Sequence, residues 1–127
     1  MKNTLTDKNG EPVVICATAL CPIAFKHTFG ADMLKDLTAI RNGETEATDV
    51  FELVSKLAFI MSAQAANEKD FIKVMNLTDS DYYEFLNRFD SGYFMDEKTH
   101  LLVFGTWFNN AEVIDKAKNP QSPPSDS

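Results

Sequence analysis

The fold is decided by one stretch near the N-terminus, Cys16-Ala-Thr-Ala-Leu-Cys-Pro-Ile-Ala-Phe-Lys-His-Thr-Phe-Gly-Ala-Asp-Met-Leu-Lys-Asp-Leu37. It predicts the end of an apolar strand, a corner, and two short helices joined by a hinge. Pro22 suits the first turn of a helix, where its missing N–H costs nothing. That helix is expected to place Ile23, Phe25 and Phe29 near one side and to end at Gly30. Asp32 is expected to open a second helix that runs through Asn42.

Upstream of this stretch, the sequence predicts a β-hairpin. Asn9-Gly10 is a strong turn dipeptide, with Thr4–Thr6 before it and Val13–Cys16 after it. Pro12 cannot donate a ladder hydrogen bond, so the second strand is expected to start there or to lie at an edge. Because a lone hairpin is marginal in water, we expect it to pack on the helices that follow.

Downstream, the helical spacing of apolar residues predicts four further helices. They cover Asp49–Ala66, Glu68–Leu77, a segment capped by Thr78 or Ser80 that carries Tyr82 to Phe89, and Asp96–Lys116. Thr48 is expected to cap the first of them, which we take as the central helix. In the second, the side chains expected to face inward are Phe71, Val74 and Met75.

These elements predict a mostly α (α+β) fold, a compact bundle of about five to six helices with a short N-terminal β-hairpin. Residues 1–118 are expected to form a single globular domain, long enough to bury a core of its own. Residues 119–127, Asn-Pro-Gln-Ser-Pro-Pro-Ser-Asp-Ser, have almost nothing to bury, so we expect a disordered Pro/Ser-rich tail.

The composition is that of an acidic, folded protein: 44% of the residues are hydrophobic, and 19 acidic against 12 basic residues give a net charge of −7. No nucleic-acid partner is expected, because phosphate contacts need clustered Lys and Arg and the two arginines, Arg41 and Arg88, lie far apart in sequence. The first ten residues are polar, and the apolar runs fall short of the ~20 residues that a membrane helix needs. We therefore expect a cytoplasmic protein without a membrane contact.

The residue chemistry predicts no catalytic, metal or cofactor site. Cys16 and Cys21 have neither the spacing of a redox motif nor that of a zinc site, and a reduced pair is expected rather than a disulfide. His27 and His100 lie on different predicted elements, and each is expected on a helix surface. Cys21 and His27 remain a possible nucleophile–base pair, but their spacing does not align them on one helix face.

Two groups of residues are candidates for contact with a partner. The first is a set of carboxylates for a basic partner, against which stands the reading of an ordinary solvated helix face: Asp70, Asp79, Asp81 and Glu84. The second is the aromatic cluster Phe104, Trp107 and Phe108, for which burial in the core is the alternative. The stretch Thr78-Asp-Ser-Asp81 is similar to an acidic ion-binding loop, but helix capping explains it better.

The opening stretch carries a set of short motifs in a recognisable order: Ala17-Thr18-Ala19, Pro22, Phe25-Lys26 and Phe29-Gly30-x-Asp32. In this order the chain resembles the small tail assembly chaperones of long-tailed (siphovirus-type) bacteriophages and prophages, over roughly Val13 to Asp115. The chain departs from the family pattern at Phe25-Lys26, where members commonly carry Tyr-Arg. The loss of the hydroxyl leaves packing possible and weakens any polar role there.

The resemblance implies a non-catalytic protein without cofactors, made in the cytoplasm of the infected bacterial host and absent from the mature virion. It implies that the chain binds the tape measure protein, keeps it soluble and recruits tail tube subunits, with possible self-association. The residues we expect to touch the partner are Phe104, Trp107 and Phe108. The competing class is an acidic phage or bacterial inhibitor that binds a basic protein partner, and a small enzyme with a concave polar pocket is a third.

Members of this family often exist in two forms, the longer one made by ribosomal frameshifting near the end of the short reading frame. Here, Ala117-Lys118-Asn119 allows codons with a run of adenines, so these residues mark a possible frameshift position. The nucleotide sequence over the three codons tests this expectation, and a run broken by other bases would count against it.

Overall fold

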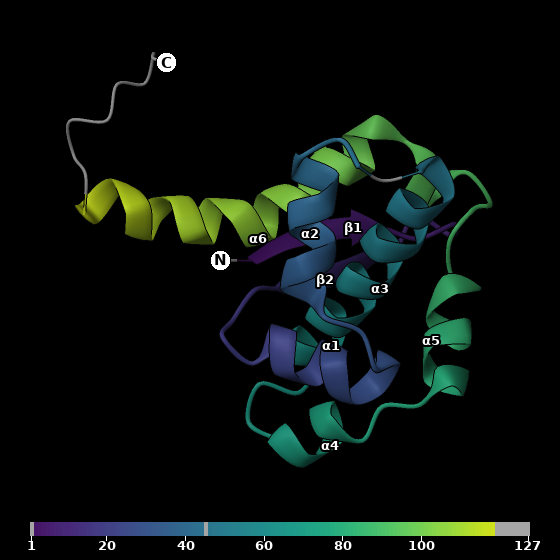
Figure 1. Cartoon of the computed structure of the whole chain (residues 1–127). Coiled ribbons are helices and arrows are strands. Elements are labelled where there is room, and N and C mark those ends of the chain that lie inside the picture. Colours follow the sequence, from purple (N-terminus) through teal and green to yellow (C-terminus); the bar gives the residue numbers. More distant parts are fainter. Residues whose placement is uncertain (1, 45, 119–127) are drawn as a thin grey trace.

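A computed structural model describes residues 2–44 and 46–118, without the side chains of residues 47, 48 and 109–118. The elements in chain order are β1 (Lys2–Thr6), β2 (Pro12–Cys16), α1 (Cys21–Phe29), α2 (Met33–Arg41), α3 (Ala47–Ala66), α4 (Phe71–Met75), α5 (Asp79–Leu86), the 3₁₀ turn η1 (Tyr93–Met95) and α6 (Glu97–Lys118). The predicted mostly helical fold with an N-terminal hairpin is confirmed (Figure 1). The predicted tail, residues 119–127, lies outside the described residues.

The hairpin pairs β1 with β2 antiparallel, in a register that sets Leu5 opposite Val13 and Thr6 opposite Pro12. The second strand starts at Pro12, as predicted. Asp7 organises the loop between the strands, since its Oδ1 accepts hydrogen bonds from the N–H groups of Asn9 and Glu11, both at 2.9 Å. These two bonds hold the pKa of the Asp7 carboxyl below its ordinary value, and the bond from the Glu11 N–H has the larger effect.

The predicted hinge between the first two helices is confirmed residue by residue. Pro22 lies in the first turn of α1. Gly30 ends α1 with a φ of 69°, a left-handed conformation that glycine adopts without strain, and its N–H donates to the Lys26 carbonyl. Asp32 then caps α2 by accepting from the Lys35 N–H at 3.1 Å. The hinge is therefore a product of local backbone chemistry.

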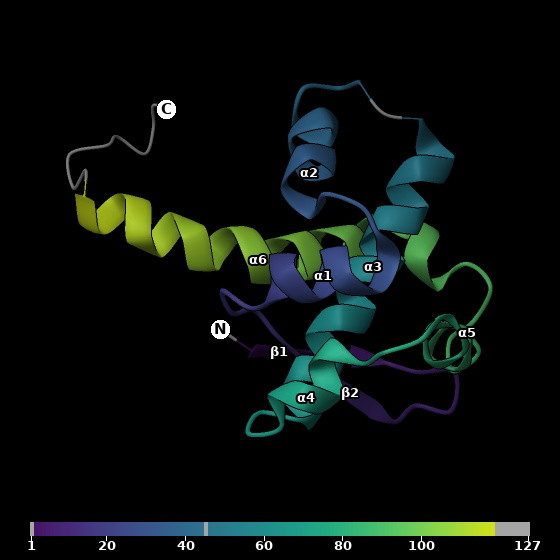
Figure 2. The same cartoon turned by 60° about the horizontal axis from the view of Figure 1, so that its bottom comes forward.

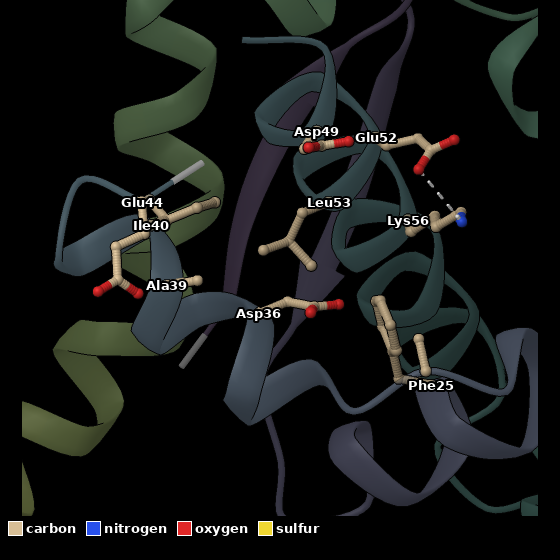
Figure 3. Close-up of a pocket in the computed structure, with 10 residues that line it drawn as sticks. Phe25, Asp36, Ala39, Ile40, Glu44, Asp49, Glu52, Leu53 and Lys56 are labelled. Atoms are coloured by element: carbon tan, nitrogen blue, oxygen red, sulfur yellow. Dashed lines mark ion pairs between the residues drawn. The ribbon is translucent and has the colours of Figure 1, made fainter. Parts of the chain in front are cut away.

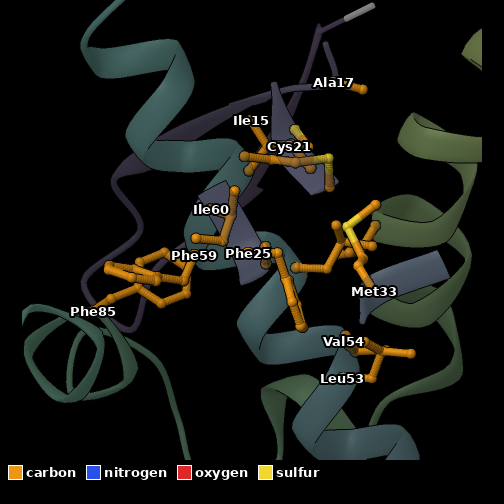
Figure 4. Close-up of a cluster of buried hydrophobic side chains, with 14 of the residues drawn as sticks. Ile15, Ala17, Cys21, Phe25, Met33, Leu53, Val54, Phe59, Ile60 and Phe85 are labelled. Atoms are coloured by element: carbon orange, nitrogen blue, oxygen red, sulfur yellow. The ribbon is translucent and has the colours of Figure 1, made fainter. Parts of the chain in front are cut away.

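Helix α3 is the centre of the molecule and contacts β2 and each of the helices α1, α2, α4, α5 and α6 (Figures 1 and 2). Five of its apolar side chains are wholly buried: Val54, Leu57, Ala58, Ile60 and Met61. Figure 4 shows Phe25 of α1 and Phe59 of α3 among these buried side chains. A polar pair joins α3 to α5, because the Ser55 and Tyr82 hydroxyl oxygens lie 2.7 Å apart in the core.

Three details of the predicted helices are wrong. Helix α3 begins at Ala47 with Glu46 as its N-cap residue, so Thr48 does not cap it. The helix predicted over Glu68–Leu77 is only α4, Phe71–Met75, because residues 67–69 form a turn and Asp70 caps the new helix by accepting from the Lys73 N–H. The helix with Tyr82 ends at Leu86, short of Phe89.

Inward and outward faces also differ from the prediction on the two short helices. Phe71, expected to face inward, is 63% exposed, because α4 has five residues and buries Val74 alone. Ile23, expected near the same side of α1 as Phe25, is 58% exposed. Residues two apart on an α-helix point roughly 200° apart, so burying Phe25 turns Ile23 toward solvent.

Helix α5 starts with a complete capping box. The Thr78 Oγ1 accepts from the Asp81 N–H at 3.1 Å, while an Asp81 carboxylate oxygen accepts from the Thr78 N–H at 2.9 Å. This confirms the capping reading of the Thr78–Asp81 stretch over the ion-binding one. Within residues 2–44 and 46–118, no helix combines the length and the apolar character needed to cross a bilayer.

Replacing the cap gives a first prediction. Thr78→Ala removes the side-chain acceptor of the Asp81 N–H, and we expect the free energy of unfolding to fall by about 1 kcal/mol. Ser80→Ala, at an exposed position of α5 outside the capping box, is the matched control and should change it by less than about 0.5 kcal/mol. Urea denaturation followed by circular dichroism measures both, and equal losses in the two variants would contradict the capping assignment.

Candidate functional site

A cleft of about 300 Å³ opens between α2 and α3 (Figure 3). Its floor is apolar, with Phe25 from α1, Ile40 from α2 and Leu53 from α3. Leu53 and Phe25 are buried, so the floor consists of the outer surface of the core itself. We call this feature the α2–α3 cleft.

The rim of the α2–α3 cleft is acidic. Four carboxylates line it, and one ammonium group: Asp36, Glu44, Asp49, Glu52 and Lys56. Lys56 lies 3.8 Å from a Glu52 carboxylate oxygen and 5.0 Å from the centre of the Phe29 ring, so it is already engaged on both sides. Among the described residues, no salt bridge reaches the other three carboxylates. The cleft therefore suits a cationic side chain with an apolar stem.

The acidic rim is not arranged as a metal site. In the part of the chain that the structure describes, no three His, Cys, Asp or Glu side chains lie close enough together to hold a metal ion. The predicted acidic patch is also not the group that lines this cleft. Its members lie on α4, α5 and their caps, whereas the cleft carboxylates come from α2, α3 and the loop between them.

A second surface is apolar and surrounds α4. Phe71 and Ile72 are 63% and 74% exposed at successive positions of this short helix. Ile23 of α1, which is 58% exposed, and the half-buried Met75 of α4 line a hollow of about 420 Å³ between the two helices, together with polar side chains such as Lys26 and Asp32. We call the four apolar residues the α1–α4 surface. Large apolar side chains gathered in the open are typical of a surface that another molecule covers.

The predicted contact residues of α6 occupy an intermediate position. Phe104, Trp107 and Phe108 are each half-buried and pack against the edge of the core. The rings of Phe104 and Phe108 are tilted neighbours with centroids 6.3 Å apart. The Arg41 guanidinium carbon lies 4.8 Å above the Phe108 ring, in the geometry of a cation–π contact. The structure thus leaves part of each of these three aromatic side chains open to solvent.

The residues that carry the family resemblance fall at the hinge and at the corner before it. Phe25 lies on the floor of the α2–α3 cleft, and Pro22, Lys26 and Asp32 line the hollow between α1 and α4. Ala17 is buried, while Ala19 and Lys26 are exposed. Phe25 lies in the core and Phe29 packs edge-to-face on it, with ring centroids 5.2 Å apart. The remaining motif positions cap or start the helices described above: Pro22, Gly30 and Asp32. Their roles in this structure are architectural.

The corner also holds a small polar cluster around Gln64 of α3. The Thr18 hydroxyl and the Cys21 thiol both donate to the Gln64 Oε1, at 2.8 and 2.6 Å. Burial raises the pKa of the Cys21 thiol to about 11. A thiol with that pKa is protonated at neutral pH, so Cys21 is a poor nucleophile. His27 is exposed on the outer face of α1, and the predicted alternative of a Cys21–His27 pair finds no support in this geometry.

This burial predicts a loss of stability in alkali. Because the folded pKa of Cys21 is about 11 against an ordinary value of 9.0, the fold favours the neutral thiol. The free energy of unfolding is therefore expected to fall as the pH rises from about 9 to 11, by about 2–3 kcal/mol from this group. Urea denaturation at several pH values measures it. Cys21→Ala should show a shallower decline, and identical slopes for the two proteins would contradict the assignment.

The possible frameshift position is only partly described. Ala117 and Lys118 belong to the last turn of α6, and Asn119 lies outside the described residues.

The comparison with family models, with curated proteins and with solved structures found no match for this chain.

Proposed function

We propose that the chain is a non-catalytic tail assembly chaperone, which binds the tape measure protein, keeps it soluble and recruits tail tube subunits. The observation that supports this proposal most is the α1–α4 surface, with Phe71 and Ile72 more than half exposed side by side. A tape measure protein is a long amphipathic helix with apolar surface to cover. Exposed apolar side chains on a folded, acidic carrier offer it a partner without adding to its aggregation.

Co-expression with the tape measure protein encoded in the same genome tests the proposal. We expect the two proteins to co-purify, and we expect a larger fraction of the tape measure protein in the soluble extract than in its absence. A folded chain that neither co-purifies nor changes this fraction would contradict the proposal. The half-buried α6 residues Phe104, Trp107 and Phe108 remain a second predicted contact, tested in the same assay by Trp107→Ala and Phe108→Ala.

The α2–α3 cleft favours a second candidate function, that of an acidic inhibitor or adaptor for a basic protein partner. Three of its carboxylates have no cationic partner among the described residues. The triple variant Asp36→Asn, Glu44→Gln, Asp49→Asn removes this charge while keeping the shape of the side chains. The inhibitor reading predicts that the variant loses its partner. The chaperone reading predicts that binding of the tape measure protein through the α1–α4 surface survives.

A further inference from the structure

The outer edge of β2 carries main-chain groups without a partner. Pro12 has no N–H, so the pair Thr6–Pro12 cannot exchange two hydrogen bonds and must be a non-bonded pair of the ladder. The Asp7 N–H donates to the Glu11 carbonyl at 2.9 Å, as this alternation requires. The pairs at Val13 and Ile15 are then the bonded ones, and the backbone of Pro12, Val14 and Cys16 points away from β1.

Four groups consequently face outward along β2: the Pro12 carbonyl, the Val14 N–H and carbonyl, and the Cys16 N–H. None of them has a hydrogen-bond partner within residues 2–44 and 46–118. On β1 the same alternation turns Thr4 and Thr6 outward; the N–H of Thr6 donates to the Tyr93 hydroxyl at 3.0 Å, and helix α6 contacts this strand. The edge of β2 has a groove beside it instead, and Val14 at its centre is 44% exposed.

A groove of about 510 Å³ runs along this open edge. One bank is β2, and the other is α5 with Asp81, Glu84 and Phe85 (the elements lie beside each other in Figure 2). The floor is the side of α3 that carries small residues, among them Ser62 and Ala63. Small side chains on a helix that is otherwise rich in large ones leave room here for a backbone to approach β2.

We propose that this groove binds one extended segment of a partner protein, which adds to β2 as a third strand. The partner's backbone meets the four outward groups, with a bonded pair at Val14. Its inward side chains are apolar, because they lie over Phe85 and Ala63. Its other side chains are basic, because Glu84 stands exposed on the α5 bank while the guanidinium of Arg88 is held 3.6 Å from Asp7.

Two other occupants fit less well. The chain's own residues 119–127 contain Pro120, Pro123 and Pro124, which cannot donate to a ladder, and α6 leads away from the body on the side remote from α5 (Figure 1). A second copy would bring a chain of net charge −7 against the acidic α5 bank, where Asp81 and Glu84 line the groove. This proposal does not depend on the chaperone function, because the groove shares no residue with the α1–α4 surface.

A displayed library of seven-residue peptides, selected on the full-length chain, tests the proposal. Ala66→Trp narrows the groove at an exposed floor position and serves as the counter-target, while Ala19→Trp, exposed outside the groove, is the matched control. We expect peptides that alternate apolar and basic residues and that bind wild type and Ala19→Trp but not Ala66→Trp. With a selected peptide bound, the Val14 amide should exchange its hydrogen at least about tenfold more slowly.

The peptide itself provides a control that leaves the protein unchanged. Methylation of its central backbone nitrogen should weaken binding at least about tenfold, because it removes the donor to β2. Three results would each overturn the proposal: no peptide enriched over Ala66→Trp, unchanged exchange at Val14 in the complex, or a concentration-dependent dimer that Ala66→Trp abolishes. The last would assign the groove to a second copy of the chain.

Discussion

Phe25→Ala is expected to lower the free energy of unfolding by about 3–5 kcal/mol. The Phe25 side chain is 1% exposed, packs edge-to-face on Phe29, and forms part of the floor of the α2–α3 cleft. Since α1 contacts α3 through this region, the substitution leaves a cavity at the centre of the fold that rigid neighbouring helices cannot fill. The same change should deepen the cleft, so binding there would also be altered.

Urea denaturation followed by circular dichroism measures this loss. Ile23→Ala is the matched control, because Ile23 lies two residues away on the same helix and is 58% exposed. We expect it to change the free energy of unfolding by less than about 0.5 kcal/mol. A loss below about 1 kcal/mol for Phe25→Ala, or equal losses for the two variants, would contradict the position of Phe25 in the core.

The parts of the fold that could be predicted from the sequence are those that depend on local chemistry. Proline in a first turn, glycine with a positive φ and aspartate at an N-cap act within one or two residues of their own position. The hinge at Pro22, Gly30 and Asp32 and the capping box at Thr78 were predictable for this reason. The periodicity of α3 was predictable as well, because a helix surrounded by neighbours keeps a wide apolar face.

The candidate surfaces could not be predicted in the same way, because tertiary contacts decide them. The apolar spacing around Phe71 and Val74 fits a buried helix, yet the turn at residues 67–69 shortens α4 and leaves Phe71 outside. The carboxylates of the α2–α3 cleft come from two helices and a loop, so no local pattern marks them as a group. The adjacent pair Phe71-Ile72 is no local signal of exposure either, because successive apolar positions are both buried on α3, as at Leu57-Ala58 and Ile60-Met61.

The groove beside β2 depends on a different kind of information. Pro12 predicted that its strand starts there or lies at an edge, and the structure confirms that the strand starts there. Which main-chain groups point outward follows only once the register sets Thr6 opposite Pro12. The small residues on α3 form the floor of a groove only because α5 lies across from β2.

The double variant Phe71→Ser, Ile72→Ser is expected to abolish rescue of the tape measure protein while the chain stays folded. Burying one large apolar side chain on binding is worth about 1.5–3 kcal/mol, so losing both should cost about 3 kcal/mol or more. At about 1.4 kcal/mol per factor of ten, the affinity should fall by about two orders of magnitude. Because both side chains are more than half exposed in the free protein, its free energy of unfolding should change by less than about 0.5 kcal/mol.

The control for this variant removes two large, exposed apolar side chains elsewhere. Leu101 and Tyr83 are 68% and 62% exposed on α6 and α5, so Leu101→Ser, Tyr83→Ser matches the double variant in chemistry but not in place. If any exposed apolar side chain served the chaperone function, the two double variants would lose rescue equally, and the α1–α4 surface would not be the site. Loss confined to Phe71→Ser, Ile72→Ser, measured by the soluble fraction and by pull-down, is the result that the proposal requires.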